Sequence, residues 1–344
     1  MPHLRSRLVA LLAVAGLAPV LALGPAPAGA GAGAGAGDGA ADGAGDRAPA
    51  VAERDPRRTQ RLFVDPQMSA AQQGPAYADI AKRAQALWLS NEHHPRDRVA
   101  DVVRAYTSRA AEAGQTPVLV VYAIPDRDCG QHSSGGLPGG DAYKDWVAQV
   151  AAGIRGSKPL VVVEPDAIGF YGHDECANGR QRLKLLRTAV RRLSGAGAWV
   201  YLDAAHSGWT PYADRARLLK KAGVDLGRGI STNVSNFRRL PREKAYAETL
   251  LRELRSEGVT GLRYVVDTSR NGARRPVDGD VTNPTWARLG KAPRLRFDGR
   301  FDATLWVKHP GESDGWSNDG GAAGQWCDLL ADRLLGRSDP GPGC

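Results

Sequence analysis

The chain has 344 residues, and its 46 Lys and Arg residues exceed its 37 Asp and Glu residues, which gives a formal net charge of +9. This length allows one large domain or two small ones. The basic excess suggests a nucleic-acid partner, but no nucleic-acid-binding motif accompanies it. The arginine-rich stretch at residues 180–192 has apolar residues on the opposite side at helical spacing, which is typical of the solvated face of an amphipathic helix. We therefore expect no nucleic-acid partner.

The first 30 residues have the pattern of a signal peptide. Arg5 and Arg7 form a basic head, residues 8–23 are apolar, and the small residues 28–30 follow. The apolar stretch is too short to span a membrane, and several prolines argue against a buried helix. We expect a secreted, extracellular protein that has no membrane attachment once residues 1–30 are removed.

Residues 31–61 are rich in Gly and Ala and then in Pro and charged residues. Such a segment buries too little apolar surface to offset the entropy lost on ordering, so we predict a flexible linker. Residues 62–344 remain as one domain of the size of an α/β barrel.

From residue 62 onward, short apolar runs alternate with amphipathic helical patterns. Strands are predicted at 84–89, 118–124, 160–163, 198–202, 229–233, 263–266 and 303–307. Helices are predicted at 99–110, 143–154, 180–193, 211–222 and 241–257. The alternation predicts a parallel sheet covered by helices, and both an open doubly wound sheet and a closed barrel fit it. No phosphate-type glycine fingerprint follows the first strand, which disfavours a nucleotide-binding fold.

Polar clusters follow nearly every predicted strand. They lie at residues 125–129, 164–166, 203–206, 233–236, 267–270 and 308–314. Ordinary turn residues explain one or two such clusters, whereas six in succession favour an active site at the carboxyl ends of parallel strands.

The residue types in these clusters favour acid and base chemistry on a neutral substrate. Several carboxylates are present without metal-ligand spacing or a G-x-S-x-G motif, so we expect neither a metal nor a cofactor. Glycoside hydrolysis needs one carboxylic acid and one carboxylate. Tryptophans in predicted loops suit sugar rings, although core packing is an equal alternative for each: Trp88, Trp209, Trp286 and Trp316. Trp146, by contrast, lies on the apolar face of a predicted helix.

Long segments of the chain resemble glycoside hydrolase family 6, the inverting cellulases. The matching segments are residues 120–130, 162–166, 201–209, 232–238, 267–272 and 305–315, in the order of the family. The resemblance extends from about Leu62 to the C-terminus. It implies a single distorted TIM-like β/α barrel with catalytic residues at the carboxyl ends of the strands. It also implies a β-glucan polysaccharide substrate, and we expect a monomer.

The resemblance assigns roles residue by residue. Asp166 matches the general acid, Asp128 the aspartate that raises its pKa, and Asp314 the proposed base, acting directly or through a water chain. Asp203 matches a further active-site acid, for which a structural role is nearly equal, and Tyr122 matches a tyrosine that crowds the distorted sugar. Substrate contacts are implied for Trp88, Ser90, Ser134, His206, Trp209, Asn236, Trp286, Lys308 and Glu312. Glu164 is interpreted as a buried structural acid.

Four cysteines in an exported protein suggest two disulfides, and the sequence alone leaves three pairings open. The resemblance implies a bond between Cys129 and Cys176. The cysteines of the family's second disulfide are absent, so Cys327 is expected to pair with Cys344. The loop after Asp314, where Trp316 stands, should then be freer than in the family.

Two loops favour cuts within the polysaccharide chain. Trp209 passes directly into a predicted helix, and residues 315–325 form a short, Gly-rich loop. The family's enzymes that release cellobiose from chain ends have long loops at both places, so we expect an open cleft and an endo-acting β-1,4-glucanase. The main alternative is a β-glucan-binding barrel without catalysis. A metal-dependent deacetylase would need a His/Asp cluster, which the sequence lacks.

Overall fold

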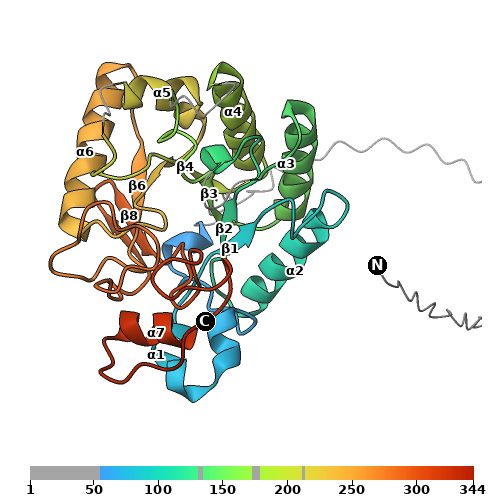
Figure 1. The fold of residues 1–344 in the computed structure, drawn as a ribbon. Helices are drawn as coiled ribbons and strands as arrows, with labels where there is room; N and C mark the ends of the chain where they lie inside the picture. The colour runs from blue at the N-terminus through green and yellow to red at the C-terminus, as the bar shows by residue number, and fades with distance from the viewer. Residues whose placement is uncertain (1–54, 131–134, 173–178, 211–213) are drawn as a thin grey trace, which may run out of the picture. The chain divides into compact units, whose positions relative to one another are not determined.

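A curled sheet of eight strands forms the centre of the computed structural model, which describes residues 55–130, 135–172, 179–210 and 214–344 (Figure 1). The strand order is β1-β2-β3-β4-β5-β6-β8-β7. The strands are β1 (Leu87–Leu89), β2 (Val118–Val121), β3 (Leu160–Val163), β4 (Trp199–Asp203), β5 (Gly229–Thr232), β6 (Arg263–Asp267), β7 (Arg294–Asp298) and β8 (Phe301–Leu305). All neighbours pair in parallel except β7, which is antiparallel to β8.

The parallel strands are short and apolar because both of their faces are covered. The four residues of β2 are all buried, and so are the four residues of β3. Parallel sheets of this kind use continuous runs of β-branched residues instead of alternation. The edge strand β7 differs, because Arg294 and Arg296 alternate with apolar residues and its exposure alternates in the same way. The sequence analysis missed β7, since its charged positions hide the apolar ones.

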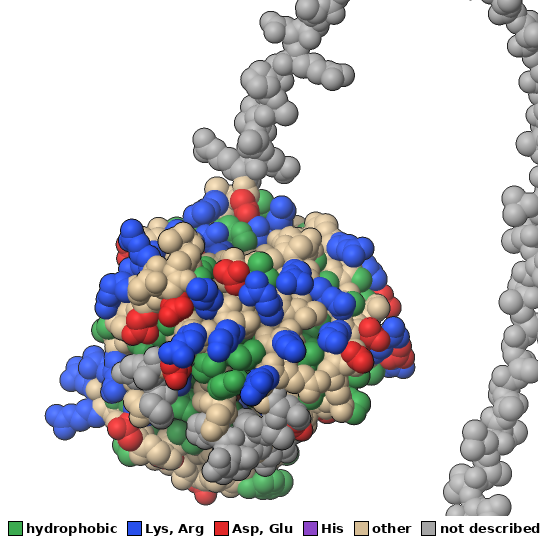
Figure 2. All heavy atoms as spheres, turned by 90° about the horizontal axis from the view of Figure 1, so that it is seen from above, with side chains coloured by type: hydrophobic (Ala, Val, Ile, Leu, Met, Phe, Trp, Pro, Cys, Tyr) green, Lys and Arg blue, Asp and Glu red, His purple; other side chains and the backbone are tan. Residues whose placement is uncertain are grey.

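Helices cover the outside of the sheet in an arc (Figure 1). They are α1 (Ala78–Ala81), α2 (Val99–Glu112), α3 (Gly140–Ile154), α4 (Gly179–Gly195), α5 (Arg215–Lys221), α6 (Leu240–Ser256) and α7 (Asp328–Leu335). The arginine-rich helix α4 is amphipathic as predicted, with Leu183, Leu186 and Leu193 buried and Arg191 exposed. Lys and Arg side chains are spread over the face in Figure 2, with Asp and Glu among them.

The sheet is a half-barrel, so the β/α architecture of the expected distorted TIM-like barrel is present, but closure of the barrel is not confirmed. The described residues show no strand ladder that joins β1 to β8. The two are linked just outside their ends, where Ala86 N donates to Trp306 O at 3.1 Å and Trp88 Nε1 donates to Val307 O at 2.7 Å. The β/α order and the carboxyl edge of the sheet, which carries the candidate site, agree with the prediction.

The folded part begins before residue 62. A short 3₁₀ helix at Pro56–Arg58 carries Arg57, which is only 4% exposed and donates to Gly197 O at 3.1 Å. Arg57 is therefore packed against the domain, although the composition of residues 55–61 is that of a linker. The predicted signal peptide and the linker up to residue 54 lie outside the described residues. No helix in the described ranges is both long and apolar enough to cross a membrane.

Candidate active site

Residues that directly follow the strands adopt left-handed backbone conformations at the carboxyl edge of the sheet. Positive φ angles occur at Asp126, Asp128, Glu164, Asp166, Ala205, Asn233 and Ser235. Non-glycine residues adopt this region rarely, and it persists where surrounding contacts over-determine it, often at functional sites. Two of the expected catalytic acids, Asp128 and Asp166, are thus held in costly conformations.

Asp166 and Asp203 form a coupled pair at the ends of β3 and β4. Asp203 is fully buried, and its carboxylate accepts from Asp166 N at 2.9 Å, Ala205 N at 3.0 Å and Ser231 Oγ at 3.1 Å. Burial raises the pKa of Asp203 to about 7. Burial, then the charge of Asp203, then that of Asp128 raise the pKa of Asp166 well above its usual value.

The hydrogen bonds decide which of the two carboxyl groups is more easily ionised. Three donors point at Asp203 and stabilise its charged form, so the proton resides on Asp166. A carboxylic acid that remains protonated near neutral pH can act as a general acid. Asp203 is thus a buried acid whose carboxylate binds the backbone N–H of Asp166 and whose charge raises the pKa of Asp166.

Glu164 is a structural acid, as interpreted from the sequence. Its buried carboxylate accepts from the backbone N of Ala123 and of Ile124, each at 3.1 Å, and from Tyr143 OH at 2.9 Å. Burial raises the pKa of Glu164 to about 7. Beyond Val121, these bonds to Glu164 take the place of hydrogen bonds to a neighbouring strand. They hold the segment that leads from β2 to Asp128 in place.

Tyr122 lies close to both Asp166 and Asp128. Burial first, and then the charges of Asp166 and Asp128, raise the pKa of Tyr122 well above its usual value, so its hydroxyl stays protonated. The ring packs edge-on against Trp88, with centroids 5.3 Å apart, and the guanidinium of Arg127 lies 4.6 Å from its centre. Tyr122 and Trp88 therefore form one aromatic wall beside the acids.

Asp314 is held as a carboxylate at the other side of the site. Its Oδ2 accepts from Arg270 Nη1 at 2.5 Å and from Asn283 N at 3.1 Å, and its Oδ1 lies 3.1 Å from Lys308 Nζ. Burial favours the neutral form, but Arg270 and Lys308 outweigh it and lower the pKa of Asp314 to about 2. Asp314 is ionised at any pH at which the protein would work.

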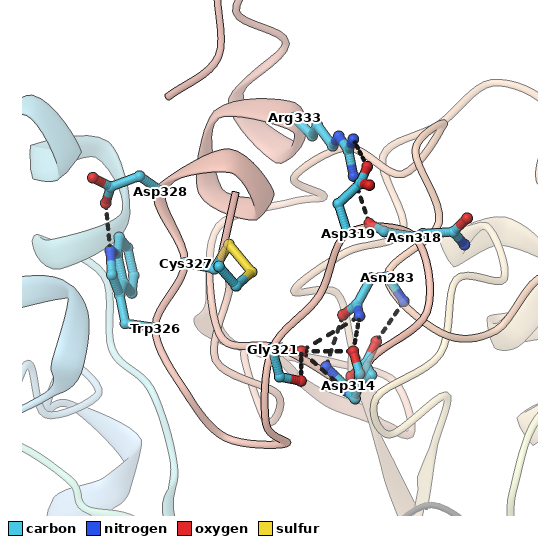
Figure 3. The surroundings of a disulfide bond; sticks show 12 residues. Asn283, Asp314, Asn318, Asp319, Gly321, Trp326, Cys327, Asp328 and Arg333 are labelled. Carbon is cyan, nitrogen blue, oxygen red and sulfur yellow. Dashed lines mark hydrogen bonds and ion pairs between the residues drawn. A yellow bond between two sulfur atoms is a disulfide. The ribbon is translucent and has the colours of Figure 1, made fainter. Parts of the chain in front are cut away.

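The loop that carries Asp314 is fastened by Asn283, which corrects the expectation of a freer loop. Asp314 N donates to Asn283 Oδ1 at 2.7 Å, while Asn283 Nδ2 donates to Gly315 O at 2.6 Å and to Ser317 O at 2.9 Å (Figure 3). Asn318 Nδ2 adds bonds to Asp280 Oδ1 at 3.1 Å and Thr282 O at 2.9 Å. We call these contacts the Asn283 clamp, and they hold the two segments together without a disulfide.

His206 and Trp209 follow β4 as expected. Burial, then nearby arginines led by Arg238, lower the pKa of His206 to about 3, so the ring is neutral. Its Nδ1 accepts from Gly208 N at 3.0 Å, which leaves the proton on Nε2 as a donor. Trp209 packs edge-on against Phe170 with centroids 4.7 Å apart, and it remains partly exposed.

An open pocket of about 320 Å³ adjoins the segment after β5. It is lined by Arg238, Arg239, Pro241, Arg242, Pro276 and Asp278. Arg238 and Arg242 also lower the pKa of His206, which places this pocket near the expected substrate contacts.

The other expected substrate contacts are dispersed around the same edge of the sheet. Trp88, Ser90, Asn236, Trp286, Lys308 and Glu312 are each partly buried. Trp286 packs against Phe237 at 5.4 Å between ring centroids, and Glu312 Oε1 is engaged by His309 Nδ1 at 2.9 Å and Ser69 Oγ at 2.5 Å. Their contact with substrate stays a prediction. Ser134 lies outside the described residues.

The pairing of Cys327 with Cys344 is confirmed, with Cα atoms 5.1 Å apart (Figure 3). Cys129 is disulfide-bonded and 7% exposed. Its expected partner Cys176 lies outside the described residues. Cys129 packs in a small cluster with Phe170 and Trp209, so it lies beside one of the expected substrate contacts.

Three residues of the site were not singled out from the sequence. Arg270 stabilises the ionised form of Asp314, and Asn283 holds Asp314 in place by hydrogen bonds. Buried Asp267 accepts from Lys308 N at 3.1 Å and Ser235 N at 2.9 Å, and so joins three strand ends. Asp267 and Arg270 both lie inside the matched segment 267–272. A basic residue in this segment, Arg270, was the feature of the sequence that could have pointed to a partner for one of the acids.

Comparison with known proteins gives one family for this fold and site. The family described as "Glycosyl hydrolases family 6" matches residues 50–338. Endoglucanase A from Cellulomonas fimi is 40% identical over 288 residues, covering 80% of this chain and 61% of that protein. Endoglucanase 1 from Streptomyces halstedii is 33% identical over 292 residues, covering 80% of this chain and 89% of the relative.

A solved structure has the same fold. The endoglucanase Cel6 from Mycobacterium tuberculosis, in complex with methyl-cellobiosyl-4-deoxy-4-thio-β-D-cellobioside, superimposes with a TM-score of 0.75 at 34% identity. The match covers 82% of this chain and 98% of that one. Against longer curated relatives the coverage is lower: the chain spans 61%, 65% and 58% of the lengths of three endoglucanases.

Proposed function

The chain belongs to family 6 of the glycosyl hydrolases, and from this premise we propose that it hydrolyses internal β-1,4-glucosidic bonds of cellulose or a related β-glucan. The observation that carries the proposal is the coupled pair of Asp166 and Asp203, which keeps a proton on Asp166 near neutral pH. A glycosidic oxygen is a poor leaving group until it is protonated, and Asp166 supplies that proton.

Asp314 supplies the negative charge that the reaction needs. Its two oxygens are already bound to Arg270, Lys308 and Asn283, and a pKa of about 2 makes it a weak direct base. A base works best when its pKa is near the working pH. We therefore propose that Asp314 acts mainly as a fixed negative charge that stabilises the developing positive charge on the sugar, while the attacking water passes its proton along a chain of waters to the solvent. Direct attack by water gives inversion at the anomeric carbon.

Short loops support cleavage within chains. The segment from Trp209 to helix α5 spans few residues, and the loop after Asp314 is short and bonded to Asn283 through Gly315 O and Ser317 O. Endoglucanases are also among the relatives with matching sequence and structure. We propose an open cleft that binds a polysaccharide along its length.

We also propose that the protein is exported and acts as an extracellular monomer. The support is the signal-like pattern of residues 1–30 and the linker-like composition that follows it. Disulfides persist in oxidising compartments, and the three cysteines among the described residues, Cys129, Cys327 and Cys344, are disulfide-bonded. A bond between Cys129 and Cys176 would fix the residue that directly follows Asp128.

The test compares the wild type with Asp166→Asn on carboxymethyl cellulose. The wild type should lower viscosity quickly while few reducing ends appear, because internal cuts shorten chains first. Asp166→Asn should lose about 10²–10⁴-fold in turnover, since Asn has no proton to donate, but should still bind cello-oligosaccharides. A substrate with an acidic leaving group should be affected much less.

Two outcomes would contradict the proposal. Near-normal turnover of cellulose by Asp166→Asn would remove Asp166 from its role. Binding of β-glucan by the wild type without release of reducing ends would instead favour a glycan-binding protein that has the fold but no catalysis.

A further inference from the structure

Trp316 is an exposed aromatic side chain beside the candidate active site. Its exposed fraction is 80%, higher than that of the other large exposed apolar residues, Val277 at 51% and Val281 at 49%. Trp316 follows Asp314 by two residues, so their Cα atoms lie within about 7 Å of each other. A large ring left in water at this place forgoes the stabilisation that burial would give.

The backbone on both sides of Trp316 is fixed. Asn283 Nδ2 donates to Gly315 O at 2.6 Å and to Ser317 O at 2.9 Å, and these are the two neighbours of Trp316 in the chain. The same amide group thus holds the loop on either side of the exposed ring. An aromatic ring on an ordered backbone loses little conformational entropy when a ligand binds to it.

The neighbouring segment adds apolar surface next to the ring. Asn318 Nδ2 donates to Thr282 O at 2.9 Å, so residues 280–283 run alongside the Trp316 loop. Half-exposed Val281 precedes Thr282 in that segment. Two of the three large exposed apolar residues of the described chain, Val281 and Trp316, therefore lie on the Trp316 loop or in the segment joined to it by the Asn283 clamp.

We propose that Trp316 is a substrate-stacking residue, which binds the apolar face of a glucosyl ring of the polysaccharide on the Asp314 side of the cleft. Sugar rings present C–H faces that pack on aromatic planes, and an exposed indole held next to a catalytic carboxylate offers such a plane. This proposal rests on the proposed function, because it takes a β-glucan chain as the ligand. The sequence left sugar stacking and core packing equal for Trp316, and its exposure decides against core packing.

The test measures binding of cellohexaose by calorimetry in the Asp166→Asn background, so that the ligand is not cut. Trp316→Ala should weaken the affinity about 3- to 10-fold, the range expected for one aromatic contact. The matched variant Trp316→Phe keeps a ring and should recover most of the affinity. Cellobiose, which is too short to reach across the site, should lose less affinity than cellohexaose.

The melting temperature separates binding from folding, and it should not change because the ring is exposed. Equal affinity of Trp316→Ala and its parent for cellohexaose would overturn the proposal, as would an equal loss in Trp316→Phe and Trp316→Ala. The proposed function is judged separately by the activity of the wild type on carboxymethyl cellulose. An active wild type with unaltered binding in Trp316→Ala would therefore contradict only the role of Trp316.

Discussion

Replacement of Asp203 by Asn should move the alkaline limb of the activity profile to lower pH. In the wild type, burial and the charges of Asp203 and Asp128 raise the pKa of Asp166, and activity falls as the pH rises through that pKa. Asn carries no charge, so the pKa of Asp166 drops towards the ordinary carboxyl range. The acid then loses its proton at a lower pH, and the alkaline limb moves with it.

The size of this effect follows from the electrostatics of a buried pair. A unit charge about 6 Å away, at an effective dielectric constant of about 20, contributes about 3 kcal/mol, which corresponds to a displacement of about 2 pH units. The variant also places an amide N–H among three donors, from Asp166 N, Ala205 N and Ser231 Oγ. This mismatch should lower the free energy of unfolding by about 1–3 kcal/mol.

The assay is kcat/KM for a soluble cello-oligosaccharide as a function of pH, measured well below the melting temperature of the variant. A substrate with an acidic leaving group serves as the internal control, because its cleavage does not depend on a proton from Asp166. Its alkaline limb should be weak in both proteins. A folded Asp203→Asn variant whose alkaline limb coincides with that of the wild type would refute the account of the pair.

Three further predictions concern the Asp314 side of the molecule. Lys308→Gln removes a charge that lowers the pKa of Asp314, so that pKa should rise from about 2 and the acid limb of the pH profile should move to higher pH; an unmoved limb would contradict this. Asn283→Ala should lower kcat, and it should lower the free energy of unfolding by about 2–3 kcal/mol. The control Asn318→Ala should keep kcat, because Asn318 does not touch Asp314. Equal activity of the two variants would argue against the clamp. Removal of the C-terminal disulfide by Cys344→Ser opens a link between residues 17 apart and should cost about 3 kcal/mol in denaturant unfolding while activity persists; loss of activity in the folded variant would show that the disulfide also supports the site.

The parallel strands were predictable because their composition is dictated by burial on both faces. Strand β3 has the predicted bounds, Leu160–Val163. Strand β2 ends three residues earlier than predicted, since Ala123 and Ile124 bond the carboxylate of Glu164 instead of a neighbouring strand. A local pattern cannot show that a distant side chain replaces a ladder bond. Whether the curled sheet closes into a barrel likewise depends on contacts between its two edges, which a local pattern cannot show.

Placement of the acids after strands was also readable from the sequence, and the structure brings Asp166, Asp128 and Tyr122 together as expected. The sequence showed that two cysteines were absent near Asp314, and this suggested a freer loop. It could not show that Asn283 makes the connection instead, because asparagine is common in loops and its partners lie about thirty residues away. The division of labour between Asp166 and Asp203 also required the hydrogen bonds around Asp203.

The stereochemistry of the first product tests the central claim most directly. If Asp166 protonates the leaving oxygen while water attacks directly, with Asp314 ionised, hydrolysis of a β-linked substrate inverts the anomeric carbon. Proton NMR of a cello-oligosaccharide digest, recorded before mutarotation, should therefore show the α-anomer of the new reducing end first. Initial release of the β-anomer would mean a retaining mechanism with a covalent intermediate, and it would contradict the roles assigned to Asp166 and Asp314.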